Sequence, residues 1–253
     1  MTAKLISYSQ PPLPFRESSY IEMNKLLSDL SKTATDLIAY CARVSNPSNQ
    51  NNKETSEKLI RYLIKHKHFS PFEMINVCLE LETTRDIAHQ IVRHRSFTFQ
   101  EFSQRYADST TALGFTTREA RLQDEKNRQN SYKLDLNDAK NMKLVREWEE
   151  MQQLVISQSE RTYKWAIENG IAKEQARVVL PEGLTKTRIY MNGTIRSWIH
   201  YIELRSGHGT QKEHMDIARE CAFEVAKVFP MIEEFVQGDV IKTKRENELE
   251  ETH

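Results

Sequence analysis

The sequence predicts an α+β fold that is mainly helical, with a small antiparallel sheet, in a single domain. Three observations support this prediction. Apolar residues recur at helical spacing in several long segments, and only a few short segments alternate between apolar and polar residues as half-buried strands do. No linker rich in proline, glycine or serine divides the 253 residues. That length is enough for one domain with a sizeable core.

The first third of the chain is expected to hold a strand at each end and helices between them. Residues 5–9 alternate and are followed by prolines at 11, 12 and 14, which is typical of an edge strand. Apolar residues at helical spacing predict helices at 35–44 and 55–65. Alternation then predicts a strand at 72–83.

The next stretch mixes charged and aromatic side chains more densely than any other part of the chain. A helix is expected from about residue 84 to Arg95, so that the cations of its last turn lie at its negative end. Alternation predicts a strand at 97–106. A helix end that leads into a strand is expected to form one concave polar site. Its members would be Arg93, Arg95, Glu101, Ser103 and Arg105.

Such a set of side chains suits a phosphorylated, planar ligand. Arginine offers a fixed fork of donors to phosphate and a flat cation for stacking, while glutamate and serine add directional hydrogen bonds to a ribose or a base. A solvated helix end followed by an ordinary amphipathic strand is the alternative that composition leaves open, because runs of charge are usually wet surfaces.

The middle of the chain combines a polar segment with the longest predicted helix. Residues 108–137 show little apolar periodicity, and we interpret them as mobile surface near the site. A helix is expected at 138–169, capped by Asn137 or Asp138 and ended by Gly170. Its apolar stripe predicts a contact with the core or with another subunit. The stripe comprises Val145, Trp148, Met151, Val155, Thr162, Ala166 and Ile167.

The last third of the chain is expected to be mostly helical. A short helix at 171–180 ends at a proline, and a strand follows at 187–191. A helix then begins at Thr194. A capping box at 210–213 is expected to open the final helix, and residues 242–253 form a charged tail.

Composition argues against several classes of protein and of site. Lysine plus arginine and aspartate plus glutamate both number 36, so the global charge gives no reason to expect a nucleic-acid or membrane partner. The three cysteines, Cys41, Cys78 and Cys221, form no C-x-x-C pair, so neither disulfides nor a zinc site are expected. A reducing, cytoplasmic location is expected instead. No segment approaches the roughly 20 apolar residues of a membrane span. His66 and His68 lack a cysteine or acidic partner at ligand spacing, so no metal is expected there.

Four ordered sequence blocks resemble the flavin-dependent thymidylate synthases. Arg93-His94-Arg95, followed by seven residues and Ser103, resembles the R-H-R-x7-S signature of that family. Gln90, Glu101 and Arg105 also stand at motif positions. The block from His68 to Glu73 resembles H-x-[ST]-P-F-E, and the block from Ala176 to Pro181 resembles A-R-x-x-L-P. The last block runs from Arg196-Ser197 through Arg205 to Gln211 and resembles N-x-R-S…R…Q. Together the blocks span more than half of the chain.

The resemblance implies an activity and a set of partners. It implies conversion of dUMP to dTMP, with methylenetetrahydrofolate as carbon donor and with FAD, reduced by NADPH, as the hydride source. It also implies a homotetramer whose sites are shared between subunits.

The resemblance further implies roles for individual residues. Positions matched to dUMP contacts are Gln90, Arg93, Glu101, Ser103, Arg105, Arg177 and Arg205, and Arg205 is the residue expected to polarise the uracil. Positions matched to FAD contacts are Ser70, Arg93, His94, Arg95, Glu101, Thr194, Arg196 and His200. His68 and Tyr106 are expected near the ring where folate and nicotinamide stack. Thr194 and His200 depart from the family, which commonly has asparagine at both positions.

A uracil ring is activated either by addition of a thiolate or by stabilisation of negative charge on the ring. The three cysteines lie in apolar patterns, where buried, inert thiols are expected, whereas an arginine-rich site suits the second route. Two rival functions remain open. One is a nucleic-acid-binding module that uses arginine and phenylalanine as a stacking platform, and the other is a metal-dependent phosphohydrolase.

Overall fold

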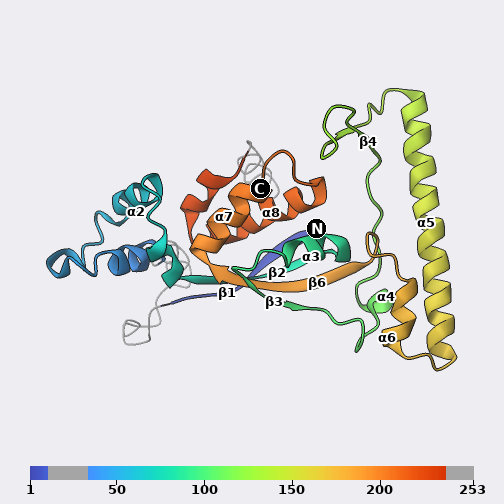
Figure 1. Cartoon of the computed structure of the whole chain (residues 1–253), viewed down its shortest axis with the longest axis horizontal. Coiled ribbons are helices and arrows are strands. Elements are labelled where there is room, and N and C mark those ends of the chain that lie inside the picture. The colour runs from blue at the N-terminus through green and yellow to red at the C-terminus, as the bar shows by residue number, and fades with distance from the viewer. Residues whose placement is uncertain (11–33, 238–253) are drawn as a thin grey trace, which may run out of the picture.

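A small antiparallel sheet lies at the centre of the molecule (Figure 1). The computed structural model describes residues 1–10 and 34–237. The sheet has the strand order β1-β2-β6-β3, and every neighbouring pair is antiparallel. The strands are β1 (Thr2–Tyr8), β2 (Asn76–Thr84), β6 (Lys186–Thr194) and β3 (Thr98–Glu101). The α+β class predicted from the sequence is therefore confirmed.

One face of the sheet is apolar and the other is polar. On β2, Val77, Leu79 and Leu81 are fully buried. Glu80 and Glu82 alternate with them and bind Tyr190 and Arg188 of β6 on the opposite face. This alternation with a period of two is the pattern that the sequence predicted for these strands.

Three helices cover the apolar face, as Figure 1 shows. They are α3 (Arg85–Ile91), α7 (Ile195–Arg205) and α8 (Lys212–Ala226). The Thr194 side chain caps α7 by accepting a hydrogen bond from the backbone N–H of Ser197. Trp198 of α7 is fully buried and donates its indole N–H to the carbonyl of Val77, 3.0 Å away. The main core therefore lies between these helices and β2 and β6.

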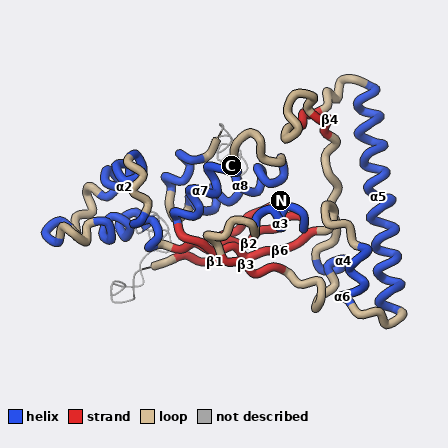
Figure 2. The backbone as a smooth tube through the Cα atoms, in the orientation of Figure 1, coloured by secondary structure: helices blue, strands red, loops and turns tan. Residues whose placement is uncertain are grey.

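Two groups of helices flank the sheet at opposite ends (Figure 2). The N-terminal group contains a helix over residues 34–42, η2 (Pro47–Asn49), α2 (Ser56–Lys65) and η3 (Ser70–Met74). The other group, which we call the arm, comprises residues 108–182. It contains α4 (Ser109–Ala112), the hairpin of β4 (Arg121–Gln123) and β5 (Ser131–Lys133), α5 (Ala139–Glu168), α6 (Lys173–Ala176) and η4 (Arg177–Val179). The short helix η5 (Pro230–Phe235) follows α8.

Several predicted elements are confirmed. The edge strand, α2, β6 and α7 lie where the sequence placed them, and β6 extends beyond the predicted residues 187–191. The side chain of Asp138 caps α5 by accepting from the backbone N–H of Lys140, and Gly170 follows the helix with a φ of 78°. The prolines at 11, 12 and 14 and the tail at 242–253 lie outside the described residues.

The predicted helix and strand around the arginine-rich run were both too long. The helix α3 ends at Ile91, and the N–H groups of Arg93 and His94 bond carbonyls three residues back, those of Gln90 and Ile91. The strand β3 ends at Glu101, and Ser103 begins a turn in which its carbonyl accepts from the N–H of Tyr106. Charged and aromatic side chains fit a helix, a strand or a turn equally well, so their pattern did not mark these ends.

The segment at 108–137 is not an unstructured excursion. It contains α4 and the β4–β5 hairpin, and Phe115 bridges to Thr185 near the start of β6. Polar side chains hold the hairpin turn, where Asp124 accepts from the N–H groups of Lys126 and Asn127. Because these contacts need no apolar periodicity, the sequence pattern did not reveal them.

Three smaller predictions were also wrong. The strand predicted from Phe72 begins at Asn76, because Phe72 lies in η3, and the helix predicted at 171–180 is divided between α6 and η4. Gln211 occupies the cap position of α8 without a side-chain hydrogen bond that caps the helix, so Thr210 does not form a capping box. The buried stripe of α5 comprises Gln152, Ile156, Ser159, Tyr163 and Ala166. Of the predicted stripe, Ala166 is buried, whereas Trp148, Met151 and Val155 are largely exposed in the single chain, so a contact of these three with another subunit stays a prediction.

Among the helices of residues 1–10 and 34–237, none is both long and apolar enough to cross a membrane.

Candidate active site

Arg205 is the last residue of α7, and it lies near the end of α3 and the start of α8. Its Nε donates a hydrogen bond to Nε2 of His94, 3.0 Å away. Because arginine nitrogens only donate, Nε2 of His94 carries no proton. Both side chains are half-buried. This bond fixes the plane of the guanidinium and leaves its terminal nitrogens available to a ligand.

The two histidines beside Arg205 are held in the neutral form. Burial, and then the charges of Arg205 and Arg93, lower the pKa of His94 to about 4. His214 of α8 is fully buried, and burial followed by the charge of Arg205 lowers its pKa to about 3. The cluster therefore concentrates its positive charge on arginine at neutral pH.

Gln90 connects this cluster to the start of α8. Its Nε2 lies 2.8 Å from Oε1 of Gln211, and its Oε1 lies 3.2 Å from Nδ1 of His214. Since an amide oxygen only accepts, Nδ1 of His214 donates to it. Gln90, His94, Arg205 and Gln211, four residues singled out from the sequence, are thus brought together in a single chain.

A second group of predicted residues gathers at the opposite end of α7. A cavity of about 480 Å³ there is lined by His68, Ser70 and Arg196, among others. Arg196 pairs with Glu73, and the rings of His200 and Phe69 lie 5.0 Å apart. Arg205 follows Arg196 by nine positions of the helix, or about 14 Å along the axis.

A third group lies between the end of β3 and α6. Arg105 pairs with Glu174 of α6 at 3.3 Å, and its guanidinium lies 5.7 Å from the centre of the exposed Tyr106 ring. Arg177, in η4 just beyond α6, is half-buried.

The remaining predicted residues are divided among these places. Glu101 accepts from Arg85 at 3.1 Å and from Thr187 at 2.9 Å, so its carboxylate is held at the sheet edge. Arg93 and Arg95 are exposed and Ser103 is half-buried. One chain therefore does not gather Arg93, Arg95, Glu101, Ser103 and Arg105 into the single concave site expected from the sequence.

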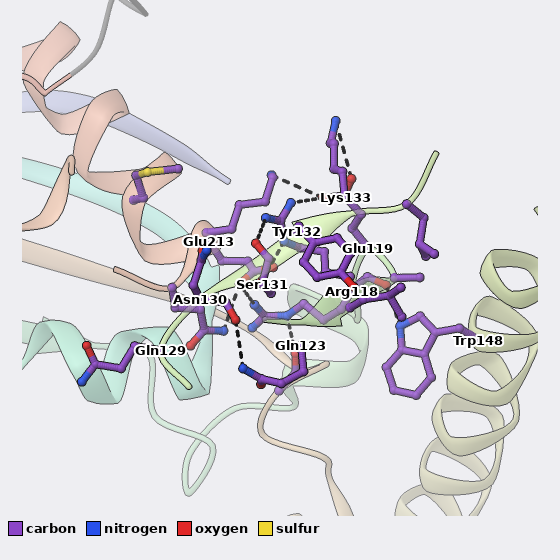
Figure 3. Close-up of a pocket in the computed structure, with 18 of the residues that line it drawn as sticks. Arg118, Glu119, Gln123, Gln129, Asn130, Ser131, Tyr132, Lys133, Trp148 and Glu213 are labelled. Carbon is purple, nitrogen blue, oxygen red and sulfur yellow. Dashed lines mark hydrogen bonds and ion pairs between the residues drawn. The ribbon is translucent and has the colours of Figure 1, made fainter. Parts of the chain in front are cut away.

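Sequence reasoning missed a second, larger cavity beside the Arg205 cluster. It has a volume of about 1270 Å³ and lies between the arm and the start of α8 (Figure 3). Arg118, Glu213 and Trp148 line it. Arg118 lies in the segment interpreted as mobile surface, and Glu213 was read only as part of a capping box. No motif drew attention to either residue.

The chain matches the family model described as "Thymidylate synthase complementing protein" over residues 25–231. It is 47% identical over 232 residues to a probable flavin-dependent thymidylate synthase of Paramecium bursaria Chlorella virus 1, with 92% of this chain and 97% of the relative covered. It is 48% identical over 196 residues to the flavin-dependent thymidylate synthase of a Synechocystis strain, with 78% and 86% covered.

The chain belongs to the flavin-dependent thymidylate synthase family. It is accordingly an enzyme, a flavin-dependent methyltransferase of dTMP biosynthesis. The crystal structure of a UMP/dUMP methylase, PolB from Streptomyces cacaoi bound with 5-Br dUMP, has the same fold. The TM-score is 0.68 at 22% identity, with 92% of this chain and 93% of that chain covered.

The residues around the cavity at the start of α7 fit part of a flavin dinucleotide. Such a cofactor carries phosphates and a flat ring system. Arg196 offers a guanidinium fork for phosphate, and its pair with Glu73 joins two side chains that are 45% and 42% exposed, a kind of pair that contributes little stability and is easily exchanged. His68 and Ser70 add donors for ring and phosphate oxygens. The side chain of Thr194, in contrast, is engaged in capping α7.

Within residues 1–10 and 34–237, no three His, Cys, Asp or Glu side chains gather as a metal site would require.

Proposed function

We propose that this enzyme converts dUMP to dTMP, with methylenetetrahydrofolate as the carbon donor and NADPH as the reductant of FAD, and without a cysteine nucleophile. The observation that supports this most strongly is the fixed Arg205 guanidinium beside the neutral His94. The PolB structure, whose ligand is a dUMP analogue, supports a pyrimidine nucleotide as substrate.

In this proposal, Arg205 activates the uracil. Methyl transfer requires an electron-rich ring carbon, and a guanidinium beside a ring oxygen stabilises the negative charge that develops there. His94 orients Arg205 through the 3.0 Å hydrogen bond and, being neutral, adds no competing positive charge. The remaining dUMP contacts are Gln90, Arg93, Glu101, Ser103, Arg105 and Arg177.

The cysteines are poorly suited to act as nucleophiles. Cys221 is fully buried, and burial raises the pKa of its thiol. Burial likewise raises the pKa of Cys78, which is partly exposed on β2. A raised pKa lowers the thiolate fraction at neutral pH, which disfavours the thiolate route. Cys41 is also partly exposed, so the sequence-based expectation of three buried thiols holds fully only for Cys221.

FAD, when bound and reduced, would supply the hydride that completes the methyl group. Ser70, His94, Arg95, Arg196 and His200 would hold it through donors and ring contacts, and Arg93 and Glu101 would contact both the cofactor and dUMP. Thr194 would contribute through its backbone, because its hydroxyl caps α7. His68 and Tyr106 would stack near the ring, where folate and nicotinamide enter.

The wide separation of these residues in one chain supports a homotetramer with sites shared between subunits. Arg105 pairs with Glu174 of α6 and Arg205 bonds His94 after the end of α3, while the flavin-side residues lie at the far end of α7. A second copy of the chain would supply the residues that a single copy leaves apart.

Absorption spectroscopy tests the proposal. The purified protein is expected to be yellow, and NADPH is expected to bleach the flavin absorbance under anaerobic conditions. Adding dUMP and methylenetetrahydrofolate should then restore the absorbance and yield dTMP. A protein that is colourless after reconstitution with FAD, or that forms no dTMP, would refute the proposal.

A further inference from the structure

Arg118 joins the arm to the body of the molecule. Its Nη2 lies 2.7 Å from Oδ1 of Asp86, and its Nε donates to the carbonyl of Gly183 at 3.1 Å. Its Nη1 lies 2.9 Å from Oε2 of Glu213, in an ion pair without the geometry of a hydrogen bond. The side chains of Arg118 and Glu213 are only 15% and 16% exposed, so water screens their attraction weakly. Figure 3 draws both residues in the lining of the larger cavity.

A directed row of hydrogen bonds runs from Glu213 to the Arg205 cluster. Oε2 of Glu213 accepts from Nε2 of Gln211 at 2.9 Å. Oε1 of Gln211 accepts from Nε2 of Gln90 at 2.8 Å, and Oε1 of Gln90 accepts from Nδ1 of His214. Every donor in this row points toward the carboxylate. If either amide were flipped, oxygen would face oxygen at one of its ends, so the negative charge on Glu213 sets the orientation of both.

We propose that Arg118 and Glu213 are positioning residues that hold the Gln90 amide in the orientation that binds the pyrimidine nucleotide. This inference rests on the proposed function, in which Gln90 contacts dUMP. The terminal amide of a glutamine rotates in a broad, shallow energy well, so an amide without fixed partners samples several orientations. Arg118 restrains the Glu213 carboxylate, the carboxylate restrains Gln211, and Gln211 restrains Gln90.

The guanidinium and the backbone of Arg118 have separate partners. Gln152 of α5 accepts from the backbone N–H of Arg118 at 2.7 Å and donates to its carbonyl at 3.0 Å. The indole N–H of Trp148 donates to the same carbonyl at 3.1 Å. Attachment of α5 therefore depends on the Arg118 backbone, whereas the row to Gln90 depends on its side chain. Substitutions can separate the two roles.

Binding of dUMP to flavin-loaded protein, measured by calorimetry, tests the inference. Arg118→Met and Glu213→Ala are each expected to raise the Kd for dUMP about tenfold, or about 1.4 kcal/mol. Glu213→Gln should raise it by less than Glu213→Ala does, because its amide oxygen can still accept from Gln211 but no negative charge holds that oxygen in place. The control variant Gln152→Leu should lower the unfolding temperature through α5 and change the Kd by less than about twofold.

A double-mutant comparison distinguishes positioning from general stability. In a Gln90→Ala background, Glu213→Ala should add little further loss, because both act through the same amide. Wild-type affinity in both Arg118→Met and Glu213→Ala, full additivity with Gln90→Ala, or an equal loss in Gln152→Leu would each overturn the inference. If Arg118→Met does not fold, Glu213→Ala decides. A wild-type protein that does not bind dUMP overturns this inference together with the proposed function, whereas a wild-type protein that binds it beside unaffected variants overturns the inference alone.

Discussion

Arg205 is surrounded by residues that fix its position without competing for its charge. His94 accepts from its Nε, and His214 lies behind His94 with ring centres 6.2 Å apart. Nδ1 of His214 donates to Gln90, and its Nε2 has no hydrogen-bond partner among the described residues. The cost of burying these neutral rings is smaller than that of burying imidazolium ions beside an arginine. The contribution of the cluster to the stability of the protein therefore depends on pH.

Acidification should destabilise the protein through these histidines. Their folded pKa values, about 4 for His94 and about 3 for His214, lie below the ordinary value of 6.5, so the unfolded state binds protons first as the pH falls. Their contribution is complete above pH 6.5 and is lost as the pH falls from 6.5 toward 4. Each histidine lowers the free energy of unfolding by at most about 1.4 kcal/mol per pH unit.

The prediction is checked with His214→Gln. Its free energy of unfolding, from urea titrations between pH 7 and pH 4.5, should fall less steeply with acid than that of the wild type. The difference in slope should correspond to the uptake of up to one proton on unfolding. Equal slopes for the two proteins would contradict the assigned neutral state of His214.

At the residue scale, the sequence predicted chemistry better than contacts. The motif positions identified Gln90, His94 and Arg205, which the structure places together. The sequence did not reveal Arg118 or Glu213, because an arginine in a polar segment and a glutamate in a first helical turn are common. Their proximity depends on how the arm folds against α8, which no local pattern encodes.

At the scale of elements, a close backbone contact supports the arginine-rich run. Gly193 of β6 lies against the ring of Phe97, and a Cβ at Gly193 would stand 2.4 Å from that ring. Phe97 in turn lies 4.8 Å from Trp198, measured between ring centres. Glycine is therefore required at 193 by space, so that Phe97 can fix the chain between Arg95 and β3.

Gly193→Ala should lower the free energy of unfolding by about 1–3 kcal/mol through overpacking. The double variant Gly193→Ala with Phe97→Leu should lower the free energy of unfolding by less than the sum of the two single changes. Gly170→Ala is the control. A Cβ there meets no atom within 4 Å, so the only expected loss of stability is the strain of an alanine backbone at a φ of 78°. Chemical denaturation provides the measurement, and wild-type stability of Gly193→Ala would contradict the packing argument.

The elements that the sequence predicted well share a strong period. The strands β2 and β6 alternate between the core and a polar face, and α7 carries buried residues at helical spacing. The hairpin in the arm lacks any such period, since hydrogen bonds to the turn backbone hold it. On α5 the face that packs within the chain includes Gln152 and Ser159, which an apolar stripe does not mark, and the exposed part of the stripe stays a predicted subunit contact.

At the scale of the whole molecule, the predicted site residues occupy three places around one sheet. The fold was predictable because helix and strand periods are local, whereas assembly of the site is not. The proposed function therefore requires other copies of the chain to bring these guanidiniums to a common ligand, an arrangement that the family resemblance implies and no periodic pattern encodes.

Mixed assemblies test the shared site. Arg105→Ala and Arg205→Ala, each expected to be nearly inactive alone, should regain activity when co-expressed, because an assembly of both chains contains sites with both arginines intact. Random mixing predicts about a quarter of wild-type turnover. Turnover of purified mixed assemblies is the measurement, and the mass by sedimentation is the control for assembly. No recovery in confirmed mixed assemblies would place both arginines of each site in the same chain.

The most direct test of the account is the rate of dTMP formation by Arg205→Ala, compared with the wild type at the same flavin content. If Arg205 stabilises negative charge on the uracil, turnover should fall about 100- to 1,000-fold while the flavin spectrum is unchanged. Turnover within a few-fold of the wild type would contradict the central claim that this guanidinium activates the ring.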